Sequence, residues 1–133
     1  MSQENVDLVR KAYDALNGGI EGLLPFHPPD VVMYSIAEWP DDPVYRGHDG
    51  VRKLTAAWTD NFDNWGFEVH EIREEGNRVL AHAEMTGRIK DTGIPIRQPL
   101  SAVFSNFREG MIGEVRFFLT WQEALKAVGL AAE

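Results

Sequence analysis

Side chains able to exchange protons gather in one stretch of the chain, between residues 38 and 49. The stretch is rich in Pro, Asp and Gly, which predicts a loop. Its ionisable residues are Glu38, Asp41, Asp42, Tyr45, Arg46 and His48. Trp39 would exclude water there and raise the pKa of a neighbouring carboxyl group, so Glu38 and Tyr45 are the candidate catalytic residues for general acid–base chemistry. The alternative is that the acidic groups are solvated and that Arg46 shapes the turn into the next helix.

Two histidine–carboxylate pairs have the spacing that places both side chains on one face of a strand. His82 and Glu84 form one pair, and Glu68 and His70 form the other. Neither pair has a third ligand at a suitable spacing, and the chain contains no cysteine. We therefore expect no metal site and no cofactor. His27 would either line the base of a pocket or form a buried hydrogen bond.

Other kinds of chemistry lack their motifs. The sequence shows no Ser-His-Asp order, no phosphate-binding glycine loop and no basic patch with interleaved aromatic residues. A net charge of −8 repels phosphate backbones and anionic lipid surfaces, so we expect neither nucleic acid nor membrane partners. No segment has the apolar length of a signal sequence or of a membrane span. The expected location is therefore cytoplasmic.

Hydrophobic periodicity predicts helices first and strands afterwards. Apolar residues recur every three or four positions between Ser2 and Leu16, and the glycines that follow end that helix. A short helix over residues 20–26 and a strand over residues 30–37 come next. Asp49 is placed to cap a third helix. The apolar face of that helix carries Val51, Leu54, Trp58 and Phe62.

Beyond Gly66 the hydrophobic period changes to two, which is typical of strands. Four strands are predicted, over residues 67–75, 78–90, 96–109 and 111–121. Short turns rich in Gly, Asn and Asp join them. Helices followed by consecutive strands predict a single α+β domain over residues 1–133, with a largely antiparallel sheet.

This order of elements resembles the nuclear transport factor 2-like fold, and within it the SnoaL-like domain. Three segments carry the resemblance: YRGHDGVRKL (45–54), FREGMIGEVRFFL (107–119) and EALKAVGL (123–130). The resemblance implies a curved sheet wrapped around the N-terminal helices, with a pocket at the open end of a cone. It also implies a homodimer through the outer sheet face. The scaffold hosts isomerases, hydrolases, cyclases and proteins that only bind.

Strand alternation separates the expected pocket wall from the outer face. Ala83, Met85, Val115, Phe117 and Leu119 would face inward. The resemblance to the isomerases of this fold implies that Ser101, Val103 and Ser105, on the preceding strand, face inward as well. The full expected pocket is Ser35, Trp39, Tyr45, Trp58, Ala83, Met85, Ser101, Val103, Ser105, Val115, Phe117 and Leu119. Such a pocket is apolar and suits a small hydrophobic molecule.

The same assignment places Leu100, Phe104 and Phe118 on the outer face, where an apolar patch would form the homodimer contact. The resemblance also indicates which positions hold the catalytic groups of the isomerases: Ala12, Ser35 and Val103, none of which can supply their acid–base chemistry. Thr120 to Glu123 forms a capping box at the last helix. The sequence therefore favours binding of a small hydrophobic ligand. The alternative is a cofactor-free isomerase, cyclase or hydrolase acting on a polyketide-like or steroid-like molecule.

Overall fold

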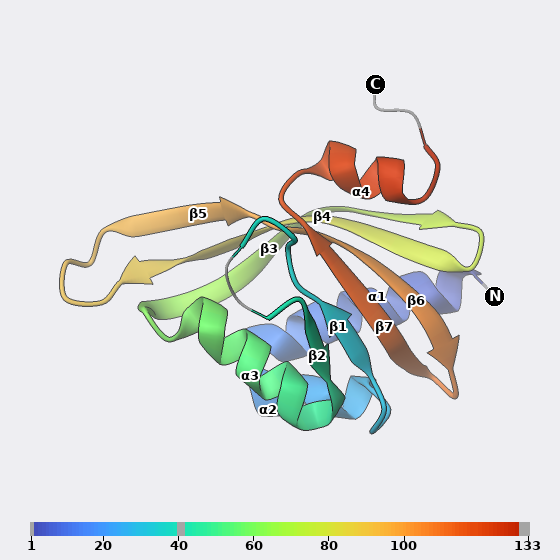
Figure 1. Cartoon of the computed structure of the whole chain (residues 1–133), viewed down its shortest axis with the longest axis horizontal. Coiled ribbons are helices and arrows are strands. Elements are labelled where there is room, and N and C mark those ends of the chain that lie inside the picture. Colours follow the sequence, from blue (N-terminus) through green and yellow to red (C-terminus); the bar gives the residue numbers. More distant parts are fainter. Residues whose placement is uncertain (1, 40–41, 131–133) are drawn as a thin grey trace.

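Helices cover both faces of one sheet in the computed structural model, which describes residues 2–39 and 42–130. The helices are α1 (Ser2–Asn17), α2 (Ile20–Leu23), the single 3-10 turn η1 (Leu24–Phe26), α3 (Gly47–Thr59) and α4 (Trp121–Ala127). The first four lie on one side of the sheet and α4 lies on the other (Figure 1). Within the described residues, no helix is both long enough and apolar enough to cross a membrane.

The strands form a mixed sheet in which antiparallel pairing dominates. They are β1 (Val32–Tyr34), β2 (Val44–Arg46), β3 (Phe62–Glu75), β4 (Arg78–Ile89), β5 (Pro95–Pro99), β6 (Ser101–Arg108) and β7 (Met111–Phe118). Their order in the sheet is β2-β1-β7-β6-β4-β3, and β5 also pairs with β4. Among the described strands, the pairing of β1 with β7 is the parallel one. The predicted α+β class with a largely antiparallel sheet is confirmed.

The β6–β7 hairpin sets the register of the central sheet. Its loop is two residues long, Glu109-Gly110, and both have positive φ angles of 53° and 72°. Positive φ at both positions is typical of a type I′ turn, whose twist matches that of the two strands it joins. Along the ladder, Val115 lies opposite Phe104 and Phe117 lies opposite Ala102. Directly opposed residues in an antiparallel pair point to the same side of the sheet.

The end of α1 is tied to the sheet by a side chain. The amide of Asn17 donates to the carbonyl oxygen of Phe67 over 3.0 Å and accepts from its N–H over 2.6 Å. Gly18 and Gly19 follow, and Gly19 has a φ of 124°, which favours glycine. The double hydrogen bond fixes the last turn of α1 against β3.

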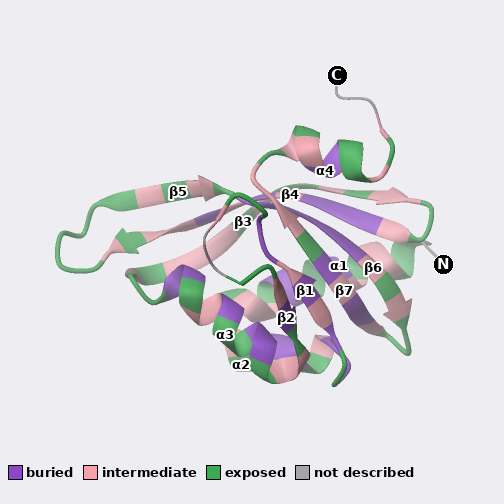
Figure 2. Ribbon diagram, viewed as in Figure 1, coloured by how far each residue is buried: buried purple, intermediate pink, exposed green. Residues whose placement is uncertain are grey.

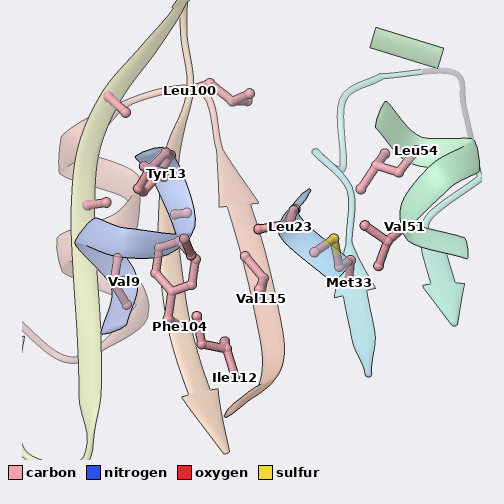
Figure 3. Packing of buried hydrophobic residues seen from close by; sticks show 14 of the residues in the cluster. Val9, Tyr13, Leu23, Met33, Val51, Leu54, Leu100, Phe104, Ile112 and Val115 are labelled. Carbon is pink, nitrogen blue, oxygen red and sulfur yellow. The ribbon is translucent and has the colours of Figure 1, made fainter. Parts of the chain in front are cut away.

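The sheet separates two groups of buried residues (Figure 2). The larger lies beneath the N-terminal helices and includes Val9, Tyr13, Leu54, Phe104 and Val115 (Figure 3). The smaller lies beneath α4 and consists of Leu80, Val103, Ala124 and Leu125. Alternation along β4 accounts for this division, because Val79, Ala81, Ala83 and Met85 belong to the first group.

The start of α3 and the strands beside it differ from the sequence prediction. Arg46 occupies the capping position, so Asp49 lies in the first turn and pairs with Arg52 over 2.9 Å instead of capping. Residues 44–46 form β2 because they pair with β1. Phe62 belongs to β3, not to α3, since a bulge at Asn64, whose φ is 54°, lets the strand begin earlier.

The predicted facing of residues 100–105 is wrong. Leu100 is 1% exposed and Phe104 is 6% exposed, and both belong to the core beneath the N-terminal helices. Val103 instead faces α4. Leu100 and Phe104 therefore cannot form an exposed patch with Phe118, which packs beside α4. A homodimer remains a prediction, but its contact would have to use other residues.

The capping box at the start of α4 is confirmed. The hydroxyl oxygen of Thr120 accepts from the N–H of Glu123 over 3.1 Å, and a carboxylate oxygen of Glu123 accepts from the N–H of Thr120 over 3.2 Å. This reciprocal pair satisfies backbone donors that the first helical turn leaves open.

We predict that Thr120→Ala lowers the free energy of unfolding by about 1 kcal/mol, because the N–H of Glu123 loses its acceptor. Urea denaturation measures the change. Thr120→Asp is the control, since a carboxylate caps equally well and should keep the wild-type stability. An alanine variant as stable as the wild type would show that the box contributes nothing.

We predict that Phe104→Ala lowers the free energy of unfolding by about 3–5 kcal/mol, because it removes a core ring. Ser105→Ala, at the half-buried neighbour on the other face, should change stability by no more than about 0.5 kcal/mol. Both are measured by urea denaturation. If Phe104→Ala were as stable as Ser105→Ala, the ring would not lie in the core.

Candidate ligand-binding cavity

A cavity of about 50 Å³ lies between the N-terminal helices and the sheet. Its lining comes from α1, α2, α3, four strands and the segment after η1, and is Ala12, Tyr13, Leu16, Leu23, His27, Met33, Leu54, Thr55, Trp58, Thr59, Phe67, Phe104, Val115 and Phe117. None of these residues is acidic, and neither Lys nor Arg is among them. The cavity is therefore an apolar chamber with a few neutral polar groups, which is the usual character of a small-molecule pocket.

Two sets of aromatic rings form the walls. Tyr13 lies against Phe104 at 5.8 Å and Phe67 at 6.1 Å between ring centroids, and Figure 3 shows Tyr13 on α1 beside Phe104. In the second set, Trp58 meets Phe117 edge to face at 4.9 Å and Trp39 at 5.5 Å. Edge-to-face packing of this kind stabilises ring positions, so the walls are defined without polar contacts.

The indole of Trp58 carries an unsatisfied donor. Its Nε1 is the one buried side-chain nitrogen or oxygen in the described part of the chain that has no hydrogen-bond partner. An unpaired buried donor costs about 1–3 kcal/mol of stability. Native structures rarely keep such a group without a function or a missing partner.

Tyr13, a residue of the lining, carries a phenol hydroxyl. Burial raises the pKa of this phenol far above its ordinary value, and neither a hydrogen bond nor a charge contributes to the shift. The phenol is therefore neutral at neutral pH and keeps its proton. It sits one helical position from Ala12, and both residues line the cavity.

His27 is held in one tautomer. Its Nδ1 lies 2.7 Å from the carbonyl oxygen of Ile112, and a carbonyl can only accept, so Nδ1 carries the proton. Nε2 then keeps its lone pair. Burial lowers the pKa of His27, the bond to Ile112 partly offsets this, and His48 lowers it further. The ring is therefore neutral, and His27 is among the residues that line the cavity.

A larger open groove adjoins this chamber. It measures about 560 Å³ and is lined by Tyr34, Ser35, Ala37, Glu38, Arg116, Phe117, Phe118, Glu123, Lys126 and Ala127. The guanidinium of Arg116 stacks 3.9 Å above the ring of Tyr34. Phe117 lines both spaces, so this ring forms a common wall between the chamber and the groove.

The predicted site residues fall into separate places. Trp58, Val115 and Phe117 line the chamber, whereas Ser35 and Glu38 lie in the groove. The two weak catalytic candidates, Glu38 and Tyr45, are therefore not brought together: Tyr45 is buried in the core on β2, opposite Met33. Asp41 lies outside the described residues.

The other predicted pocket residues do not line the chamber either. The core beneath the helices instead takes up Ala83, Met85 and Leu119. Trp39 packs against the same core and contacts Trp58. Ser101, Val103 and Ser105 point to the opposite side because they pair with Phe118, Arg116 and Glu114. Their inward assignment, which came from the resemblance to isomerases, is wrong.

Sequence reasoning missed Tyr13 and Phe104 as chamber residues and left His27 between two alternatives. Tyr13 lies in the apolar stripe of the first helix, so its position in the sequence already indicated a phenol in the core. The two-residue turn at Glu109-Gly110 already places Phe104 opposite Val115. For His27 both alternatives hold, since it lines the chamber and makes a buried hydrogen bond.

The outer face of β3 and β4 brings three metal-ligating residues together. One ligand atom each from Glu68, His70 and Glu84 lies within 4.8 Å of the others. Arg97 already pairs with both carboxylates, at 2.9 Å from Glu68 and 3.3 Å from Glu84. His70 contacts Glu84 over 3.0 Å. A cation there would have to displace the guanidinium, so the cluster is satisfied as an ion-pair network.

Comparison with known proteins identifies the family and the fold. The family model of the SnoaL-like domain matches residues 9–115. Solved relatives include a protein from Jannaschia sp. CCS1 provisionally assigned as a SnoaL-like polyketide cyclase, at 18% identity and a TM-score of 0.74, covering 100% of this chain and 96% of that one. No protein of curated function matches the chain.

Two further solved structures share the architecture. A nuclear transport factor 2-like protein of unknown function from Burkholderia pseudomallei K96243 is 20% identical, with a TM-score of 0.72 over 97% of this chain and 99% of its own. A hypothetical protein with a ketosteroid isomerase-like fold from Catenulispora acidiphila DSM 44928, in complex with trimethylamine, is 17% identical, with a TM-score of 0.71 over 92% of each chain. At these identities the likeness concerns the fold.

The lowered pKa of His27 gives a pH-dependent stability with a definite sign. Below the ordinary value of 6.5 the unfolded chain binds a proton at this residue before the folded one does. The free energy of unfolding should therefore be fully retained above 6.5 and should fall as the pH drops below that value toward the folded pKa.

Urea denaturation between pH 7.5 and 5 measures this dependence. His27→Asn is the matched variant, because its amide can still donate to the Ile112 carbonyl but does not titrate. We expect the variant to lose stability less steeply than the wild type over this range. Parallel pH profiles would show that His27 does not contribute to the linkage.

Proposed function

The chain belongs to the SnoaL-like domain family, and we propose that it binds a small, uncharged, largely apolar molecule carrying a hydrogen-bond acceptor. The ligand occupies the chamber between α1, α3 and the sheet. The observation that carries this proposal is the unpartnered Nε1 of Trp58, on a residue that lines an otherwise apolar chamber. A carbonyl or ether oxygen in the chamber would give this donor its partner.

The lining argues for a neutral ligand. An ion transferred into this chamber would lose its hydration, and no side chain of opposite charge is there to compensate. Thr59 cannot help as a donor, because its hydroxyl already donates to the carbonyl oxygen of Thr55 over 2.7 Å. Affinity would therefore come from burial of apolar surface, and orientation from the few remaining polar groups.

The volume of the chamber in this structure limits the size of the ligand. A volume of about 50 Å³ accommodates a few waters or a small ring, whereas pockets for drug-sized molecules are typically about 300–1,000 Å³. Phe117 separates the chamber from the groove. A rotation of this half-buried ring would join the two spaces, so a larger molecule would enter from the groove and place its apolar part against Trp58.

We predict that cyclohexanone binds more tightly than methylenecyclohexane, which has nearly the same shape but lacks the oxygen. Satisfying one buried donor is worth about 1.4 kcal/mol, or roughly tenfold in affinity. Trp58→Phe keeps an aromatic ring but removes the N–H, so the variant should bind both compounds alike. Isothermal titration calorimetry measures the dissociation constants.

Trp121→Phe is the control for this experiment. It removes an indole from the opposite face of the sheet, where Trp121 stacks on His82 at 5.1 Å, and should leave the tenfold preference intact. Two results would contradict the proposal: no saturable binding of either probe, or the same preference in Trp58→Phe as in the wild type.

A further inference from the structure

The two histidine–carboxylate pairs of the sequence meet on the outer face of β3 and β4, on the opposite side of the sheet from the chamber. Glu68 and His70 belong to one strand, and His82 and Glu84 belong to the other. We propose that Glu68, His70 and Glu84 bind a zinc ion, which exchanges with the guanidinium of Arg97. This site is independent of the proposed function, because it shares no residue with the chamber or the groove.

Strand pairing joins the two pairs that lie apart in the sequence. Glu68 lies directly opposite Glu84 in the β3–β4 ladder. A bulge between Val69 and Glu71 leaves His70 without a partner in that ladder. Nε2 of His70 lies 3.0 Å from a carboxylate oxygen of Glu84. The ladder thus supplies the third ligand that each pair lacks in the sequence.

The opposed carboxylates require a positive charge between them. Like charges directly opposite each other on neighbouring strands are destabilising. Arg97 on β5 provides the counter-charge, at 2.9 Å from Glu68 and 3.3 Å from Glu84. A guanidinium carries a single positive charge against two negative ones, whereas a divalent ion matches both. The net charge of −8 adds a general attraction for cations.

Displacing Arg97 from the carboxylates costs little. Its side chain is 53% exposed, and that of Glu68 is 52% exposed. Ion pairs this open to water contribute little to stability, so the guanidinium can move into solvent. A zinc ion held by three side chains replaces these weak pairs with direct coordination bonds.

The ligand atoms determine which metal suits the site. Glu68, His70 and Glu84 each offer one atom, and the three atoms lie within 4.8 Å of one another. Ligand atoms around one tetrahedral zinc ion are about 3.3 Å apart, because each bond is about 2.0 Å long. Small movements of exposed side chains close that difference. One imidazole nitrogen with two carboxylate oxygens suits zinc, whereas magnesium and calcium prefer oxygen ligands alone.

Aromatic neighbours hold the ring of His70 in place. This ring meets His82 edge to face, with 5.3 Å between the centroids. His82 in turn stacks on Trp121, the first residue of α4, at 5.1 Å. Neighbours that fix the orientation of a metal ligand raise the affinity for the metal, so the imidazole loses little further freedom when zinc binds.

Isothermal titration calorimetry with zinc chloride at pH 7.5 tests the site. We expect one zinc ion per chain with a micromolar dissociation constant, and no saturable heat with magnesium chloride. Zinc should also raise the midpoint of thermal unfolding, because it binds the folded chain. Absence of saturable zinc binding by the wild type would refute the proposal.

Four variants assign the roles. His70→Gln and Glu84→Gln each remove a ligand and should weaken zinc binding more than about 100-fold, since even outer contacts to metal ligands are worth about 10–100-fold. Arg97→Ala removes the competing cation and should tighten binding about threefold. Asp14→Asn is the charge-matched control: it removes an exposed acid from α1, on the other side of the sheet, and should change nothing. Circular dichroism establishes that each variant is folded.

Arg97→Ala distinguishes exchange from support. An arginine needed to position the carboxylates would weaken zinc binding when it is removed, whereas a competing cation would strengthen it. Zinc binding that is unchanged or weaker in folded Arg97→Ala therefore contradicts the proposal. Binding that persists at wild-type strength in His70→Gln or Glu84→Gln places the ion elsewhere and also contradicts it.

Discussion

The two-residue turn at Glu109-Gly110 is the constraint on which the chamber depends. Once it fixes the register of β6 against β7, Phe104 must point to the same side as Val115, and Ala102 to the same side as Phe117. These residues form the floor beneath Tyr13 and Trp58. A slip of one residue would move every one of these side chains to the face of α4. At Gly113 the hairpin has no space for a side chain, because a Cβ there would lie 2.6 Å from the carbonyl oxygen of Asn106.

The same hairpin also determines the chemistry of the chamber. The carbonyl that fixes the tautomer of His27 belongs to Ile112, one residue into β7. The register thus places an aromatic floor and a hydrogen-bond acceptor at once. Around them the lining is apolar and uncharged, and the Nε1 of Trp58 is left without a hydrogen-bond partner. An unpartnered buried donor reduces stability, and the proposed ligand would offset that cost by accepting its hydrogen bond.

Local signals were enough to predict much of the fold from the sequence. The apolar stripe of α1, the turn residues and the capping box at Thr120 each depend on neighbours within a few positions, and the structure contains them. The prediction of which side chains of β6 face inward was wrong because this strand is buried on both sides. Val103 and Phe104 point to opposite faces and are both buried, so alternation along the strand carries little information. The turn register would have resolved it. The inward assignment of Ser101 and Ser105 was taken from isomerases, and it does not transfer to this chain.

The candidate site was less predictable because it depends on contacts between distant segments. His27 and Ile112 are 85 residues apart, and neither residue type signals the other. The composition of the acidic loop predicted the catalytic candidates, yet Glu38 lines the groove and Tyr45 is buried in the core. An orphaned indole N–H is likewise a property of packing: Trp58 was expected in the pocket, but nothing in the sequence shows that its donor lacks a partner.

The most direct test of the account is the nuclear magnetic resonance signal of the Trp58 indole N–H, assigned with the Trp58→Phe variant, during titration with cyclohexanone. Binding of the ketone oxygen to this donor predicts a saturable downfield shift of its proton, and no such shift with methylenecyclohexane. A Trp58 signal that stays unchanged at ketone concentrations that saturate the protein would contradict it, because the ligand would then be bound somewhere other than against the donor that defines the chamber.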